Sequence, residues 1–170
     1  MSAGVRAPAM APLALLGASL LRASLCHGAD SATPQYPEGA KAFASNCAVC
    51  HGAAGAGQPA LAPPLLANPA RYASVAEGRR QLALTVLFGM FGDITVEQKH
   101  YNFKMPEFTK LGDDALAAVL NYVVFDLAHA SADSTALTSA EIASARSLPV
   151  GADTVRQHRA ALLVALGLAN

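Results

Sequence analysis

Two cysteines and one histidine fall within five consecutive residues, Cys47-Ala48-Val49-Cys50-His51. Thiols three positions apart can lie on the same side of a helical turn. From there both can add to the two vinyl groups of a haem, and the histidine that follows can ligate the iron. Because C-x-x-C-H is the attachment signature of c-type haem, we predict one covalent haem c. Cys47 and Cys50 would form its thioethers and His51 would bind the iron.

Two other chemistries use closely spaced cysteines, a thiol–disulfide pair and a zinc site. A thioredoxin-like pair follows a strand in a βαβ pattern, whereas Cys47 follows an alanine-rich segment with a helical pattern. A zinc site needs further cysteine or histidine ligands, and the sequence has no second cysteine pair. The pattern therefore favours haem attachment over both.

A haem that only transfers electrons needs a second axial ligand opposite His51. We prefer Met105, because it precedes Pro106 in an irregular segment that can present a side chain to a flat cofactor. A thioether is a soft donor that raises the reduction potential relative to a second imidazole. It also keeps oxygen and peroxide off the iron. The alternatives are an open site or one of Met90, His100, His129 and His158.

His51 also needs an acceptor for its other ring nitrogen, because that hydrogen bond fixes the tautomer and the orientation of the ring. The Pro63-Pro64 bend is rigid and must pass near the haem. We expect a backbone carbonyl of this bend to accept the bond.

The elements expected to position these residues are helical, and no region of the sequence is rich in strand patterns, so we predict an all-α fold. One short helix is expected over 38–46. A second is expected to begin at Ser74, with Glu77 completing a capping box, and to end at Gly89.

The segments between and after these helices carry weaker signals. Residues 52–70 contain too many glycines and prolines for regular structure. A small hairpin is possible within the irregular segment 92–110, and its two strands would be Ile94–Val96 and Tyr101–Phe103. A strong helix capped by Asp113 or Asp114 should run to about Leu127, because its apolar residues recur at helical spacing.

The segment 129–170 is expected to form a C-terminal helical extension. Thr138 and Glu141 form a capping box that opens a short helix to about Ser147. A further helix is possible over Thr154–Leu168, and its apolar run is too short to span a bilayer.

Residues 1–29 have the pattern of an export signal. A weakly basic start is followed by an apolar stretch and then by small residues, with possible cleavage after Gly28 or Ala29. We therefore expect export to the periplasm. Retention as an N-terminal membrane anchor is the alternative, and a lipid anchor through Cys26 is a weaker one. Residues 30–37 would be a flexible lead-in.

The charge balance excludes one class of partner. The chain has 12 basic and 12 acidic residues, so no excess of positive charge is available to bind a polyanion. We expect no nucleic-acid partner.

Taken together and in order, these motifs resemble a class I cytochrome c over roughly residues 36–128. The matching segments are a Gly39–Phe43 helix, the Cys47–Gly52 haem box and the Pro63–Leu65 turn, followed by the Tyr101–Pro106 methionine loop and a closing Leu116–Val124 helix. The resemblance implies a helical domain over 38–128 wrapped around one haem. It also implies that the Pro63 carbonyl bonds His51, and that Gly39 and Phe43 pack across the closing helix near Tyr122.

The expected function is one-electron transfer rather than catalysis. The insert before Met105 and the C-terminal tail look most similar to bacterial monohaem cytochromes that serve dehydrogenases and oxidases. The protein would therefore be a free carrier, or the electron-accepting subunit of a dehydrogenase or oxidase, with redox proteins as partners. The alternative is a haem peroxidase or gas sensor with an open or labile sixth position, which would need a distal acid–base residue such as His100.

Overall fold

The structure is a computed structural model that describes residues 1, 3–4 and 33–168. The chain divides into two units, Met1–Ser31 and Ala32–Asn170. The expected export signal over 1–29 and Cys26 lie almost wholly outside the described residues. None of the described helices combines the length and the apolar character needed to cross a membrane.

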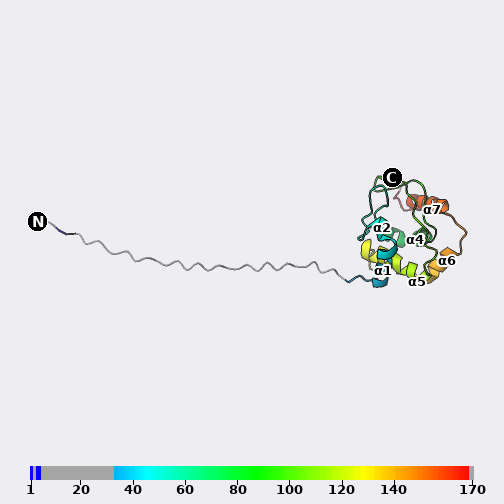
Figure 1. The fold of residues 1–170 in the computed structure, drawn as a ribbon, viewed down its shortest axis with the longest axis horizontal. Helices are drawn as coiled ribbons and strands as arrows, with labels where there is room; N and C mark the ends of the chain where they lie inside the picture. The colour runs from blue at the N-terminus through cyan, green and yellow to red at the C-terminus, as the bar shows by residue number, and fades with distance from the viewer. Residues whose placement is uncertain (2, 5–32, 169–170) are drawn as a thin grey trace. The chain divides into compact units, whose positions relative to one another are not determined.

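The regular structure of the unit that begins at Ala32 is almost wholly helical, as predicted (Figure 1). Its strands form one antiparallel hairpin. In chain order the elements are α1 Pro37–Asn46, α2 Ala48–His51, α3 Asn68–Ala73, α4 Ala76–Phe88, β1 Ile94–Val96, β2 Lys99–Tyr101, α5 Asp113–Asn121, the π-helical turn η1 Tyr122–Leu127, α6 Ser139–Arg146 and α7 Ala152–Ala165.

The crossing of α1 and α5 is close because it contains a glycine. A Cβ atom on Gly39 would lie 2.1 Å from the Ala118 carbonyl oxygen and 2.8 Å from Tyr122 Cβ. One turn later Phe43 is 1% exposed, and its ring centroid lies 5.4 Å from that of Tyr122. The packing expected for this pair of helices is therefore present.

Helix α4 is the centre of the larger hydrophobic core. It packs against α3, α5, α6 and α7, and it lies near the middle of the helical unit in Figure 1. Its apolar residues are buried on more than one face, because helices cover it on several sides. These residues are Leu82, Ala83, Leu84, Val86 and Leu87.

The C-terminal extension shares that core. Leu137, Ile142 and Leu162 pack with the apolar residues of α4 and α5. The predicted capping box is confirmed, because the Thr138 side chain accepts from the Glu141 N–H while the Glu141 carboxylate accepts from the Thr138 N–H. The helix expected over 154–168 is α7, which begins two residues earlier and ends three residues earlier.

Two sequence predictions about the segment before α4 are wrong. The stretch 52–70 was expected to lack regular structure, but α3 begins at Asn68 within it. Ser74 is the C-cap of α3 rather than the N-cap of α4, and its hydroxyl donates to the Arg71 carbonyl at 2.8 Å. The N-cap of α4 is Val75, which caps nothing with its side chain.

The other boundaries need smaller corrections. The hairpin is present, but β2 spans Lys99–Tyr101, so Tyr101 pairs with Ile94 and the strand ends before Phe103. Gly112, not an aspartate, is the N-cap of α5. The helix expected to run to Leu127 changes to π geometry at Tyr122.

Candidate haem site

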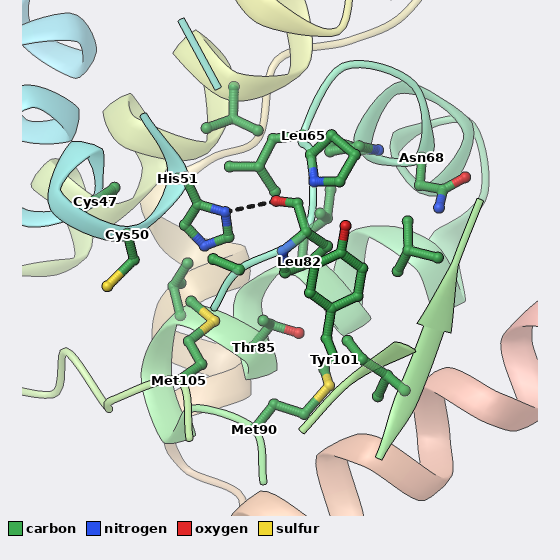
Figure 2. A pocket seen from close by; sticks show the side chains of 18 of the residues that line it. Cys47, Cys50, His51, Leu65, Asn68, Leu82, Thr85, Met90, Tyr101 and Met105 are labelled. Carbon is green, nitrogen blue, oxygen red and sulfur yellow. Dashed lines mark hydrogen bonds between the residues drawn. The ribbon is translucent and has the colours of Figure 1, made fainter. Parts of the chain in front are cut away.

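The residues singled out by the motifs line one cavity. Cys47, Cys50 and His51 come from the α1–α2 region, Pro63 comes from the following loop, and Met105 comes from the segment after the hairpin. Figure 2 shows Cys47 and Cys50 on one side of this cavity and His51 directed into it. Most other lining side chains are apolar, including Phe43, Leu65, Leu82, Val86, Ile94, Val119, Leu120 and Val123.

The two thiols lie on one helical turn, Cys47 at its start and Cys50 within it. Cys47 is the N-cap of α2, and the His51 N–H donates to the Cys47 carbonyl at 2.9 Å, so the motif closes on itself as one turn. Both cysteines are half-buried and unbridged. Burial, together with the nearby Cys50, raises the pKa of the Cys47 thiol to about 11. Reactive redox pairs depend on a lowered thiol pKa, so this environment does not support the thiol–disulfide alternative.

His51 has one ring nitrogen held and the other free. Its Nδ1–H donates to the Pro63 carbonyl oxygen at 2.9 Å, which leaves a lone pair on Nε2. Burial lowers the pKa of the ring, although the bond to Pro63 opposes that shift. Neutral imidazole is the form that binds iron. In Figure 2 the second ring nitrogen points into the cavity, on the side where Met105 lies.

The loop that carries Pro63 is folded tightly against the motif. The Gly57 N–H donates to the His51 carbonyl at 2.8 Å. Gly57 has a φ of 76°, and a Cβ atom there would lie 2.7 Å from the Ala62 carbonyl oxygen. Glycine is therefore required at this position for the chain to return and present Pro63 to His51.

The two methionine candidates are neighbours across a β-bridge. Met90 and Met105 exchange backbone hydrogen bonds of 3.2 and 2.9 Å. Both side chains line the cavity, with Met90 8% exposed and Met105 partly buried. Gly89 allows the approach, since a Cβ atom there would lie 2.3 Å from the Met105 carbonyl oxygen.

None of the other candidate histidines lines the cavity. His100 is exposed on β2, with Nδ1 3.4 Å from the Thr95 hydroxyl. His129 is exposed at a φ of 51°. His158 is partly buried on α7, and its Nδ1–H donates to Gln81 Oε1 at 2.6 Å. Within the described part of the chain, no cluster of three metal-binding side chains exists that would suit zinc.

The polar residues that line the cavity include Tyr72, Gln81 and Arg159, which the motifs did not identify. All three are buried. Arg159 lies within the helix expected over Thr154–Leu168, where no motif marks it. Its position between the buried Val155 and Leu162 is the one sequence signal that could have identified it.

A comparison with known families agrees with this arrangement. The family model for cytochrome c matches residues 36–124, a span that includes the motif, the Pro63 loop and Met105. The chain belongs to the cytochrome c family. The family match confirms the prediction of a class I cytochrome c made from the sequence motifs, and with it the all-α, cytochrome c-like fold.

Two curated proteins are similar to this cytochrome c. A cytochrome c-552 from Thermus thermophilus is 41% identical over 86 residues, which is 51% of this chain and 65% of that protein. A second cytochrome c-552, also from Thermus thermophilus, is 41% identical over 86 residues as well, which is 51% of this chain and 57% of that protein. The matched segment thus spans less than two thirds of either relative.

The cofactor of the family is covalent haem c, and the donors in this cavity fit it. Cys47 and Cys50 satisfy the C-x-x-C-H pattern. An imidazole nitrogen with a free lone pair and two thioether sulfurs face an apolar interior. Haem iron accepts histidine and methionine as axial ligands. The cavity therefore holds side chains of the kinds that can attach haem c and ligate its iron.

Proposed function

We propose that this cytochrome c is an exported one-electron carrier, not an enzyme, with haem attached through Cys47 and Cys50 and ligated by His51 and Met105. The observation that carries the proposal is the single cavity lined by these four side chains. When bound, the haem supplies an iron centre that gains or loses one electron.

The protein's own residues would hold that centre in two ways. The Pro63 carbonyl fixes the His51 ring, and this hydrogen bond makes the imidazole a stronger ligand for iron. The apolar wall keeps water away, which limits the reorganisation that accompanies a change of charge. A sixth ligand from Met105 would occupy the position that a substrate of a peroxidase or a gas would need.

The export pattern and the mouth of the cavity support a location and a class of partner. We propose a periplasmic location on the basis of the export pattern over 1–29, with membrane contact only if that segment is retained. Partners would be a dehydrogenase, an oxidase or a reductase. Val49 and Phe103 line the cavity and are 76% and 60% exposed, so a partner would meet an apolar surface at its mouth.

The alternative of a peroxidase or gas sensor has less support. Such a site needs an acid–base group on the distal side, and peroxidase chemistry moves protons through it. His51 is the one histidine among the described residues that line the cavity. His100, the proposed distal residue, is exposed on β2 and does not line it.

The test is the sulfur-to-iron charge-transfer band in the near-infrared spectrum of the oxidised protein. We expect the wild type to show the band and Met105→Ala to lose it. The variant should also have a lower reduction potential and bind cyanide. Met90→Ala is the matched control, because it removes the other lining thioether, and it should keep the band. A band that disappears in Met90→Ala and survives in Met105→Ala would refute the ligand assignment. Rapid binding of cyanide by the wild type would refute the proposal that the protein is only an electron carrier.

A further inference from the structure

Residues 106–112, which join Met105 to α5, form no helix or strand. The Phe108 N–H donates to the Val86 carbonyl of α4 at 3.0 Å, and the Leu111 N–H donates to the Phe108 carbonyl at 3.0 Å. The first bond attaches the connection to α4, and the second closes a turn within it. We call residues 106–112 the methionine segment.

Arg146, on helix α6, binds the methionine segment with its whole guanidinium group. Nη1–H donates to the Thr109 carbonyl and Nη2–H to the Leu111 carbonyl, both at 2.8 Å. Nε–H donates to Asp113 Oδ1 at 2.8 Å, and Nη2 lies 2.7 Å from the same oxygen. Helix α6 lies beside α5 (Figure 1). One side chain of the C-terminal extension therefore holds two carbonyls of the segment and the first residue of α5.

The bonds of Arg146 are sheltered from solvent in part. Its side chain is 29% exposed and that of Asp113 is 30% exposed, whereas the Lys41 and Glu38 side chains of an open surface pair are 73% and 76% exposed. Screening by water and salt is weaker for a partly buried pair. A guanidinium also presents its donors in a rigid fork, so this contact restrains the position of the segment as well as its charge.

A methionine ligand to iron depends on such restraint. Because methionine ligation raises the reduction potential, the sulfur binds ferrous iron more tightly than ferric iron. In the oxidised protein the position of the sulfur therefore depends on the chain that carries it. Pro106 fixes the backbone directly after Met105, and Thr109 is four positions from Met105. Opening of such a segment has its own free energy, separate from that of global unfolding.

We propose that Arg146 is a positioning residue for the sixth ligand, because its bonds to the methionine segment keep the Met105 sulfur on the ferric iron. The proposal rests on the proposed function, since it requires Met105 as the ligand. Arg146 does not line the cavity, and it lies beyond residue 124, where the family match ends. The C-terminal extension would thus act on the iron through the segment that carries its ligand.

The test is the rate at which cyanide binds to oxidised Arg146→Gln holoprotein. Cyanide reaches the iron when the methionine segment opens and the sulfur leaves, so the rate reports the population of the open form. We expect binding about tenfold faster than in the wild type, the size that corresponds to the loss of one hydrogen bond to a charged group. The near-infrared sulfur-to-iron band should remain in the variant, because the closed form still predominates.

Arg79→Gln is the matched control, because Arg79 makes the same kinds of bonds away from the methionine segment. Its guanidinium donates to the Thr135 and Ala136 carbonyls at 2.7 and 2.9 Å and to the Glu141 carboxylate. The Arg79 side chain is 14% exposed, so its loss should lower the free energy of unfolding at least as much as the loss of Arg146. The control should bind cyanide at the wild-type rate. A purely structural role for Arg146 would give both variants the same rate.

An Arg146→Gln holoprotein that binds cyanide no faster than the wild type or Arg79→Gln would overturn the proposal. If Arg146→Gln yields no holoprotein, Arg146→Lys is compared with Arg79→Lys. Lysine keeps the charge but carries its donors on one nitrogen, without the fork that spans both carbonyls. Faster binding in Arg146→Lys than in Arg79→Lys supports the proposal, and equal rates overturn it. A wild-type protein without the near-infrared band would refute Met105 ligation, and this proposal with it, before any rate is measured.

Discussion

At the residue scale, one hydrogen bond determines which nitrogen of His51 faces the cavity. The Pro63 carbonyl accepts from Nδ1–H at 2.9 Å, so Nε2 carries the lone pair that a metal needs. The pKa of the ring is lowered by burial, which keeps the imidazole neutral near pH 7. The Cys47 thiol beside it has a raised pKa of about 11 and stays protonated. The two environments suit an iron ligand next to an attachment point, rather than a reactive thiol pair.

Replacing either cysteine should reduce the amount of holoprotein. Cys47→Ala and Cys50→Ala each remove one of two thioethers, so less haem should remain with the chain after export, and the double variant should retain none covalently. Val49→Ala is the control, because Val49 lies between them and is 76% exposed. The measurement is haem absorbance per mole of purified protein. Full covalent haem in the double variant would contradict the attachment assignment.

Which residues of the site could be predicted depends on how far apart they lie in the sequence. Cys47, Cys50 and His51 are adjacent in sequence, so their chemistry can be predicted from spacing alone. Gln81 and Arg159 belong to the cavity only because α4 and α7 pack together. No local pattern encodes that contact between segments more than 70 residues apart.

At the element scale, the closest helix crossing depends on Gly39. A Cβ atom there would lie 2.1 Å from the Ala118 carbonyl oxygen, so Gly39→Ala must push α1 away from α5. We expect a loss of about 1–3 kcal/mol in the free energy of unfolding from the strained packing, partly offset by the higher helix propensity of alanine. Gly112→Ala is the control for an added Cβ that meets nothing within 4 Å, and because Gly112 is the N-cap of α5 we expect a small loss, less than that of Gly39→Ala.

Denaturant unfolding of the two glycine variants provides the measurement. Equal stability of Gly39→Ala and the wild type would show that the crossing tolerates a side chain, which would contradict this account of how α1 meets α5.

The junction between α4 and α6 should make stability depend on pH. Arg79 Nε donates to Glu141 Oε1 at 2.7 Å, and this bond lowers the pKa of Glu141 from its usual 4.5 to about 2. Because the folded-state pKa is depressed, the stabilisation is full above about pH 4.5 and is lost as the pH falls toward 2. Glu141 is partly exposed, so solvent screening reduces the size of the effect.

Glu141→Gln should therefore narrow the stability difference between neutral and acidic pH. The measurement is the free energy of unfolding of variant and wild type across this range, with the gap between them closing in acid. Glu38→Gln is the control, since the Glu38–Lys41 pair is about three-quarters exposed on both sides. A gap that stays constant with pH would contradict the role of the Arg79–Glu141 pair.

The two wrong predictions about α3 and α4 both come from residues that are found at helix ends as well as in loops. Pro69 made the start of α3 resemble a loop, although proline is well tolerated in the first turn of a helix. Ser74 and Glu77 match a capping box, but Ser74 already ends α3 and bonds back to Arg71. Patterns of this kind identify a helix end without saying which of two adjacent helices it belongs to. The isolated box at Thr138 and Glu141 has no such competitor and was predicted correctly.

At the scale of the whole molecule, we expect charge to contribute little to the recognition of a redox partner. The chain has equal numbers of basic and acidic residues, and Lys104 and Arg159 are the positive side chains among the described residues that line the cavity. Association steered by charge weakens steeply with salt. An apolar mouth formed by Val49 and Phe103 should make partner binding depend only weakly on ionic strength.

The helical extension and the haem cavity belong to one structure. Ile142 and Val155 are fully buried in the same core as Leu87 and Leu116. The buried Asn121 accepts from the Leu137 N–H at 2.7 Å and donates to the Leu137 carbonyl at 2.9 Å. The segment beyond the family match is thus fixed to the elements that form the cavity, which is why a residue on α7 can line it.

The central claim is that this chain carries haem covalently through Cys47 and Cys50. The most direct measurement is acid–acetone extraction of the purified holoprotein, followed by the intact mass of the precipitated chain. The account predicts that the haem stays with the protein and that the mass exceeds that of the polypeptide by one haem. Haem that passes freely into the solvent, with a chain of unmodified mass, would contradict it.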